Sequence, residues 1–190
     1  MTLQNKNKMS LVKGQRTGLL GGSFNPAHIG HLHISNLALE HLNLDCVWWV
    51  VSPQNPLKPV DGMASLDQRM EKACEVAKNS NIIVTDIERQ LGTQYTSNTL
   101  PAIQKIFPEG HFVWLMGSDN LAQIEQWHQW ETIFMTLPVA IFSRSAYSND
   151  VENLKSVKQF APFQVIEADA SKLADMKPPA WALLKTPLNP

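Results

Sequence analysis

The chain has 190 residues, 44% of them hydrophobic and 17% charged, and its formal net charge at pH 7 is −1. This length and composition predict a single globular domain with a substantial core. The near-neutral charge excludes a general electrostatic attraction to nucleic acid, so an anion would have to be bound by a local site. No apolar run approaches the length of a membrane span.

The two cysteines, Cys46 and Cys74, lack the spacing of a metal site or of a disulfide framework. This favours buried thiols in a reducing compartment, and we expect a cytoplasmic protein. The first sixteen residues contain four basic residues and no acidic one, without the apolar segment of a signal peptide. We therefore expect a disordered basic tail over residues 1–16 and a single domain over residues 17–190.

The first expected strand covers residues 17–20 and leads into the string GGSFNPAHIGH at residues 21–31. Leucines then recur at roughly helical spacing up to Leu42, which predicts an amphipathic helix. A glycine turn between a strand and a helix is where α/β folds bind phosphates. We expect Gly21 and Gly22 to let backbone N–H groups approach such a ligand, because glycine has no Cβ.

Two histidines in this string, His28 and His31, are three residues apart and should project from one face of the first helical turn. Gly30 between them leaves room for a bound group. Imidazoles beside free N–H groups at the positive end of a helix dipole suit a polyphosphate. The alternative, a surface His28 and a packed His31, fits this string less well.

The rest of the chain alternates apolar runs with segments that have helical signals. The later expected strands cover residues 46–51, 81–85, 111–116, 137–142, 163–166 and 179–184. A capping box of Ser65 and Gln68 predicts a helix to about Lys78. Further helices are expected from a cap at Thr96, Ser97 or Asn98 to about residue 107, from Leu121, and over 151–160. This order predicts a Rossmann-like, doubly wound, mostly parallel sheet with helices on both faces.

Several side chains near the ends of these strands are candidates for binding. Lys58 lies in a proline-rich loop after the second strand, and we expect Arg69 at the surface. Asp119, just beyond the strand at 111–116, is placed to accept hydrogen bonds from ribose hydroxyls or to cap the next helix. Trp127 and Trp130 should share a helical face and pack in the core, although a flat aromatic ring also suits a stacked ligand.

The string at residues 21–31 resembles the signature of the nucleotidyltransferase superfamily that uses H-x-G-H in place of a P-loop. Its members transfer AMP or CMP from a nucleoside triphosphate to a phosphorylated acceptor. Three later segments resemble bacterial nicotinate-nucleotide adenylyltransferases in particular. The first is residues 86–100, which resemble the family's segment in which an E-x-x-R element leads to a Tyr-Thr pair, here Tyr95-Thr96. The others are the G-x-D element at 117–119 and the tryptophans that follow it.

The resemblance implies adenylyl transfer from ATP to nicotinate mononucleotide, which gives deamido-NAD and pyrophosphate. It implies catalytic roles for His28 and His31, and contacts of Thr96 and Trp127 with the nicotinate nucleotide. The residues that it implies for ATP and phosphate binding are Gly21, Gly22, Ser23, Phe24, Gly30, Lys58, Gly117, Asp119 and Arg144. Mg²⁺ would be bound with the ATP phosphates, without a metal cluster on the protein.

The sequence also departs from the family pattern. Relatives have Arg-Pro-Gly where this chain keeps only Arg144, and a Ser/Thr-rich turn ending in Ile-Arg before a last helix where this chain ends at residues 187–190. We therefore expect that C-terminal motif to be missing. Two alternatives stay open: a related enzyme acting on nicotinamide mononucleotide or phosphopantetheine, and a nucleotide-binding protein without turnover. We expect no nucleic acid or membrane partner, and a homo-oligomer is neither indicated nor excluded.

Overall fold

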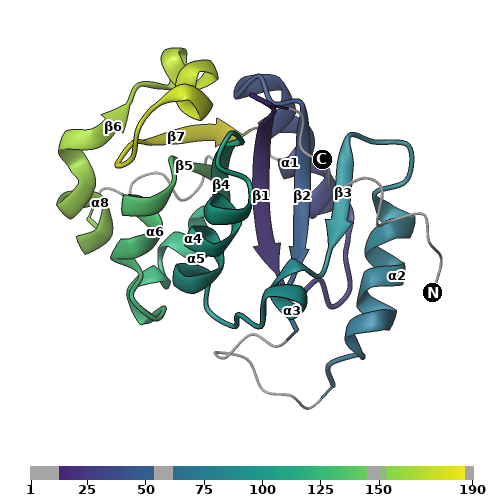
Figure 1. The fold of residues 1–190 in the computed structure, drawn as a ribbon. Helices are drawn as coiled ribbons and strands as arrows, with labels where there is room; N and C mark the ends of the chain where they lie inside the picture. The colour runs from purple at the N-terminus through teal and green to yellow at the C-terminus, as the bar shows by residue number, and fades with distance from the viewer. Residues whose placement is uncertain (1–12, 54–61, 145–150, 152, 187–190) are drawn as a thin grey trace.

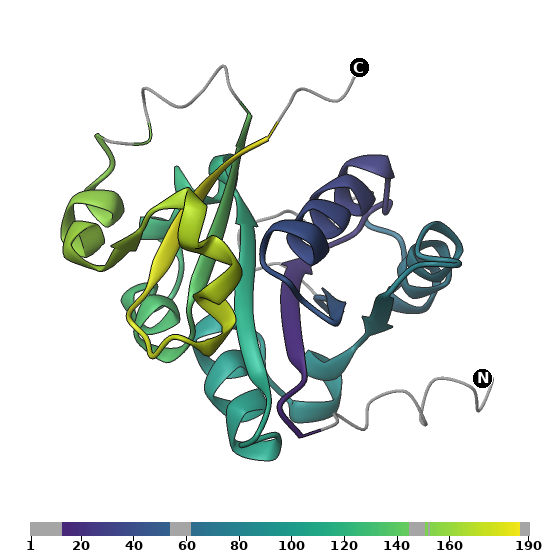
Figure 2. The ribbon, with the colours of Figure 1, turned by 90° about the horizontal axis from the view of Figure 1, so that it is seen from above.

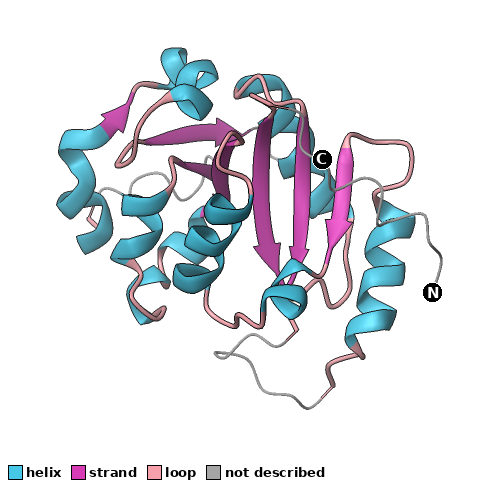
Figure 3. Cartoon of the chain, in the orientation of Figure 1, coloured by secondary structure: helices cyan, strands magenta, loops and turns pink. Residues whose placement is uncertain are grey.

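The computed structural model describes residues 13–53, 62–144, 151 and 153–186. They form a seven-stranded sheet in the order β3-β2-β1-β4-β5-β7-β6, in which every neighbouring pair is parallel (Figures 1 and 3). The strands are β1 (Arg16–Gly22), β2 (Cys46–Val51), β3 (Ile82–Thr85), β4 (His111–Gly117), β5 (Val139–Arg144), β6 (Gln164–Val165) and β7 (Trp181–Thr186). The predicted Rossmann-like α/β architecture is confirmed.

Helices cover both faces of the sheet, and each face has its own core. One face carries α1 (Ile29–His41), α2 (Leu66–Val76) and η4 (Glu167–Asp175), and the view from above shows α1 and α2 on the same side (Figure 2). The other face carries α3 (Ile87–Leu91), α4 (Thr96–Ile106), α5 (Ser118–Leu121), η1 (Ile124–Gln126), α6 (Glu131–Thr136) and α8 (Lys155–Phe160), which is followed by η3 (Ala161–Phe163). The neighbours Trp48 and Trp49 of β2 are both buried, one in each core, because successive strand residues point to opposite faces.

The order of the strands indicates which edge of the sheet is expected to bind ligands. From β1 the chain moves outward through β2 to β3, and then returns to the other side of β1 to form β4 and β5. Open α/β sheets bind ligands at the carboxyl ends of the strands where the direction of winding reverses. Here that point lies between the carboxyl ends of β1 and β4, on the edge where β1, β2 and β3 end at the bottom of Figure 1.

The glycine pair belongs to β1 rather than to the turn after it. Gly21 pairs with Val50 and Gly22 with Val51, so the strand extends two residues further at its carboxyl end than predicted. A Cβ on Gly21 would lie 2.3 Å from Cη2 of Trp114 in β4. Gly21 is therefore required by close packing against β4, and the turn starts only at Ser23.

The predicted capping box of α2 is confirmed, but the predicted cap of α4 is wrong. The N-cap is Tyr95, whose carbonyl oxygen accepts hydrogen bonds from two backbone N–H groups of the first turn. The hydroxyls of Ser97 and Thr99 are engaged with His128 and Glu88 instead. Pro101 consequently lies inside the helix, beyond the first turn that proline normally prefers.

The segment around the two tryptophans is not the single helix that we expected. The short η1 ends at Gln126, Trp127 has an extended backbone, and Gln129 has a φ of 45° before α6 begins. This left-handed residue breaks the helical path, so Trp127 and Trp130 do not share a helical face. Both short helices in this region, and also α3 and η4, were missed by the sequence pattern.

None of the helices in the described ranges is long and apolar enough to cross a membrane. Cys46 is buried as expected, whereas Cys74 is exposed, so the expectation of two buried thiols is wrong for Cys74. Burial raises the pKa of Cys46.

Candidate nucleotide-binding site

Both histidines of the H-x-G-H string accept backbone hydrogen bonds at the start of α1. His28 is the N-cap, and its Nδ1 accepts the N–H of Gly30 at 3.1 Å. His31 is the third residue of the helix, and its Nδ1 accepts the N–H of His28 at 3.3 Å. The ring centroids are 4.0 Å apart, so the expected juxtaposition of the two imidazoles is present.

These hydrogen bonds orient both rings and select a tautomer. A nitrogen that accepts a hydrogen bond carries no proton, so a neutral imidazole held in this way carries its hydrogen on Nε2. In both rings, Nδ1 is the atom that the backbone holds. Gly30 is needed here, because a Cβ at that position would lie 3.0 Å from the His28 ring.

The aromatic rings of Phe24 and Trp49 pack against the histidine pair. Phe24 is buried in a left-handed conformation with a φ of 47°, and its ring centroid lies 4.6 Å from that of His31 and 5.1 Å from that of Trp49. Trp49 donates from Nε1 to the hydroxyl of Ser35 at 2.7 Å, and Ser35 donates to the His31 carbonyl at 2.8 Å. Strand β2 thus holds both the turn and the helix that carry the histidines.

At the end of β4, Gly117 and Asp119 lie at the same edge of the sheet as the histidine pair. Gly117 is the N-cap of α5 and Asp119 is an exposed residue in its first turn. The carboxylate folds back over the glycine, since a Cβ on Gly117 would lie 2.3 Å from Asp119 Oδ1. Asp119 is therefore not the N-cap that the alternative interpretation expected, and its carboxylate faces solvent at the carboxyl edge of the sheet.

The segments that carry Thr96 and Trp127, both predicted to bind the pyridine nucleotide, contact each other through neighbouring residues. Thr96 is the first residue of α4, and the half-buried Trp127 lies in the segment after η1. Between these segments, Tyr95 stacks on His128 with centroids 4.4 Å apart, and the Ser97 hydroxyl is 3.2 Å from His128 Nδ1. Sequence reasoning did not single out His128, although it lies between the two tryptophans.

The second tryptophan and a nearby carboxyl group have structural roles. Trp130 packs edge-on against Phe134 and Phe160, as expected for a core residue. Glu88 is buried beside α4 and accepts a hydrogen bond from Thr99 at 3.0 Å. Burial raises the pKa of Glu88, against the opposing effect of that hydrogen bond.

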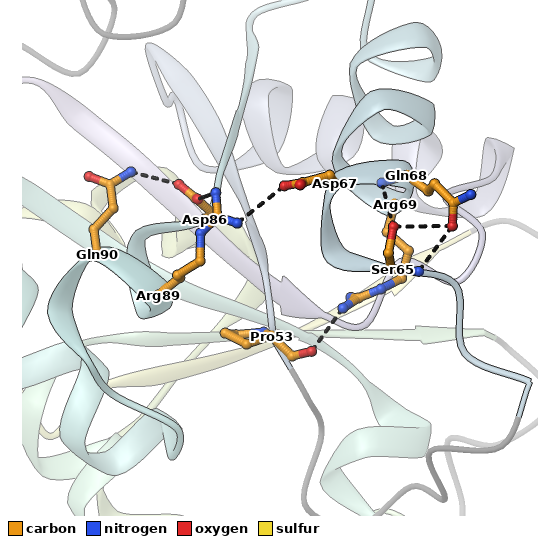
Figure 4. A network of polar contacts seen from close by, with 8 residues as sticks. All are labelled: Pro53, Ser65, Asp67, Gln68, Arg69, Asp86, Arg89 and Gln90. Atoms are coloured by element: carbon orange, nitrogen blue, oxygen red, sulfur yellow. Dashed lines mark hydrogen bonds and ion pairs between the residues drawn. The ribbon is translucent and has the colours of Figure 1, made fainter. Parts of the chain in front are cut away.

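Arg69, which we expected at the surface, is buried with 2% of its area exposed. Its guanidinium donates to the carbonyl oxygens of Ser23, Ser52, Pro53 and Ala64 at 2.6–3.0 Å, and Figure 4 shows the bond to Pro53. The prediction was wrong because the partners are backbone carbonyls of loops distant in sequence. Burial lowers the pKa of Arg69, but arginine stays charged in proteins.

The remaining candidates are located only in part. Lys58 lies outside the described residues. Arg144 is the last residue of β5 and pairs with Thr186 of β7, while its side chain is outside the described part of the structure. Within the described ranges, no group of three or more His, Cys, Asp or Glu side chains is arranged to hold a metal ion.

The chain is similar to known proteins of one family. The model of the cytidylyltransferase-like family matches residues 19–176. A probable nicotinate-nucleotide adenylyltransferase of Parvibaculum lavamentivorans is 45% identical over 177 residues, which cover 93% of this chain and 88% of that protein. A protein of the same name from Methylorubrum extorquens is 44% identical over 172 residues, covering 90% of this chain and 93% of the relative.

Solved structures share the fold at lower identity. The nicotinic acid mononucleotide adenylyltransferase of Plasmodium falciparum, solved in complex with NaAD, superposes with a TM-score of 0.69 at 18% identity and covers 93% of this chain and 77% of its own. The identity to the bacterial relatives and the extent of the family match establish the assignment. The chain belongs to the cytidylyltransferase-like family, as one of its nicotinate-nucleotide adenylyltransferases.

Proposed function

We propose that this protein transfers the adenylyl group of ATP to nicotinate mononucleotide, giving deamido-NAD and pyrophosphate. The observation that carries the proposal is the histidine pair at the start of α1, next to the point where the sheet winding reverses. Each ring is held there through Nδ1, and we expect Nε2 to be the atom that donates to phosphate oxygens. The names of the bacterial relatives support the choice of acceptor.

The reaction needs positioning and charge stabilisation rather than a protein nucleophile. An oxygen of the acceptor's 5′-phosphate attacks the α-phosphorus of ATP in line, and the bond to the bridging oxygen breaks as pyrophosphate leaves with the electron pair. A phosphate group is largely ionised at neutral pH, so the attack requires no general base. His28 and His31 would donate to the phosphate oxygens on which charge accumulates.

The other candidate residues have complementary roles in this proposal. Asp119 would accept hydrogen bonds from ribose hydroxyls, and Thr96 and Trp127 would hold the pyridine ring. Mg²⁺ would enter with ATP, coordinated by its phosphates and by water, and would neutralise part of their charge. We further propose a cytoplasmic protein, because the two cysteines are not joined in a disulfide.

The test is pyrophosphate release from Mg-ATP with nicotinate mononucleotide, nicotinamide mononucleotide and phosphopantetheine offered separately. We expect release with the first acceptor. Release with only one of the other two would reassign the acceptor. ATP binding without release in any of the three assays would instead identify a nucleotide-binding protein without turnover.

A further inference from the structure

Arg69 of α2 joins three backbone segments at the carboxyl edge of the sheet. Its Nη1 donates to the Ser23 carbonyl at 2.6 Å, in the turn after β1, and to the Ser52 carbonyl at 2.8 Å, in the segment after β2. Nη2 donates to Pro53 at 2.8 Å, and Nε to Ala64, just before α2, at 3.0 Å. A planar guanidinium is suited to this task because its donors point in fixed, divergent directions.

The positive charge of Arg69 has no carboxylate partner among the described residues, since all four acceptors are neutral carbonyl oxygens. The carboxylates of Asp67 and Asp86 are instead paired with the exposed Arg89 of α3 (Figure 4). A buried cation without a counter-ion is costly. Within the described residues this charge is offset only by carbonyl dipoles, so its field also acts on an anion that binds nearby.

The hydrogen bond to Ser23 also sets the direction of the next backbone donor. The Ser23–Phe24 peptide is trans, because the described cis bonds are Asn25–Pro26 and Pro178–Pro179. In a planar trans peptide the C=O and the N–H point in opposite directions. The N–H of Phe24 therefore points away from Arg69. The Ser23 carbonyl of the same peptide group accepts a hydrogen bond from the cation, and this polarises the peptide and strengthens the Phe24 N–H as a donor. This peptide lies four residues before His28.

We propose that Arg69 is a positioning residue for the nucleotide phosphates, which it serves without touching them. It orients the Ser23–Phe24 peptide so that the Phe24 N–H is presented on the side opposite the guanidinium, and it places an unpaired positive charge behind that donor. The inference rests on the proposed adenylyl transfer for the identity of the anion. It concerns ATP binding, however, and can be tested whether or not turnover occurs.

The first experiment compares Arg69→Met and Arg69→Lys with the wild type in the binding of Mg-ATP and of adenosine, which has no phosphate. We expect Arg69→Met to weaken Mg-ATP binding at least about tenfold and to leave adenosine binding unchanged. Arg69→Lys keeps the charge but loses the planar guanidinium, so its affinity for Mg-ATP should lie between those of the wild type and Arg69→Met. The matched controls are Arg89→Met and Arg89→Lys, which should bind both ligands as the wild type does.

An equal loss of affinity for ATP and adenosine, or no loss for either in a folded variant, would overturn the proposal. If neither variant folds, the wild type provides the test through the backbone amide of Phe24 in ¹⁵N-labelled protein. Its resonance should shift on addition of Mg-ATP and stay in place with adenosine. A Phe24 amide resonance that does not shift with Mg-ATP would exclude the positioning role of Arg69. A wild type that binds ATP but releases no pyrophosphate would refute only the adenylyl transfer.

Discussion

His28 and His31 each use Nδ1 to accept a backbone N–H, which stabilises the first turn of α1. Serine or aspartate would cap the helix as well. A helix cap alone does not require histidine at both positions, and in the proposed function both rings also donate to phosphate oxygens through Nε2.

At this scale we predict that His31→Ala lowers kcat about a hundredfold and weakens ATP binding much less. The reason is that the donor acts mainly on charge that develops in the transition state. The measurement is the steady-state rate of pyrophosphate release together with the ATP dissociation constant. His41→Ala, at the exposed last turn of the same helix, is the control. Normal turnover of the His31 variant would refute the role.

The sequence revealed the histidine pair because its evidence is local: two residues three apart at a predicted helix start. It could not reveal Arg69, whose four partners are carbonyl oxygens of segments brought together only by the fold. His128 was missed for a similar reason, since its contacts with Tyr95 and Ser97 cross from one loop to another helix. Backbone acceptors and aromatic stacks of this kind leave no pattern in sequence spacing.

At the scale of elements, the strands were predicted well and the short helices poorly. Continuous apolar runs such as residues 46–51 identify buried parallel strands directly. The start of α4 depends instead on which hydroxyl is engaged elsewhere, and the break before α6 depends on the single left-handed residue Gln129. Both are decided by tertiary contacts.

The fit of β1 against β4 gives a prediction about stability. Gly21→Ala would bring a Cβ to 2.3 Å from the Trp114 ring, so the free energy of unfolding should fall by about 1–3 kcal/mol. Gly22→Ala is the matched control, because its Cβ would meet the Phe24 ring at 3.4 Å, an ordinary contact. Urea unfolding of both variants provides the comparison. Equal decreases in the free energy of unfolding would mean that the strand backbone, rather than the Trp114 contact, causes the destabilisation.

At the scale of the molecule, the edge of the sheet opposite the site is held by a polar cluster. Asp175 at the end of η4 bonds Arg16, the first residue of β1, and His111, the first residue of β4, whose Nδ1 lies 2.7 Å from Asp175 Oδ1. Partial burial raises the pKa of Asp175, but the hydrogen bonds and charges of His111 and Arg16 lower it more. Its net pKa is therefore below the usual value.

This shift predicts how stability depends on pH. A carboxyl group whose pKa is lower in the folded state stabilises the protein above its unfolded pKa of about 3.9, and this contribution is lost as pH falls through the folded pKa. Asp175→Asn should therefore reduce the free energy of unfolding above about pH 4, and the difference from the wild type should vanish in stronger acid. The effect should be modest, because the side chain is 39% exposed.

The control for this experiment is Asp169→Asn, which removes a surface pair with Lys172 in the same helix. It should leave the unfolding profile nearly unchanged, as expected for an exposed pair. ATP binding should be normal in both variants, since the cluster lies at the amino ends of the strands. A constant difference between Asp175→Asn and wild type at every pH would contradict the assignment.

The mutual cap of the two histidines ties their rings to the backbone at the start of α1. Each ring is held through Nδ1 by an N–H of that turn, so neither ring can rotate away without leaving a backbone donor unsatisfied. The stability of the first helical turn therefore also keeps the two imidazoles at a fixed separation. A ligand that binds them would meet a preformed pair and would not have to order it first.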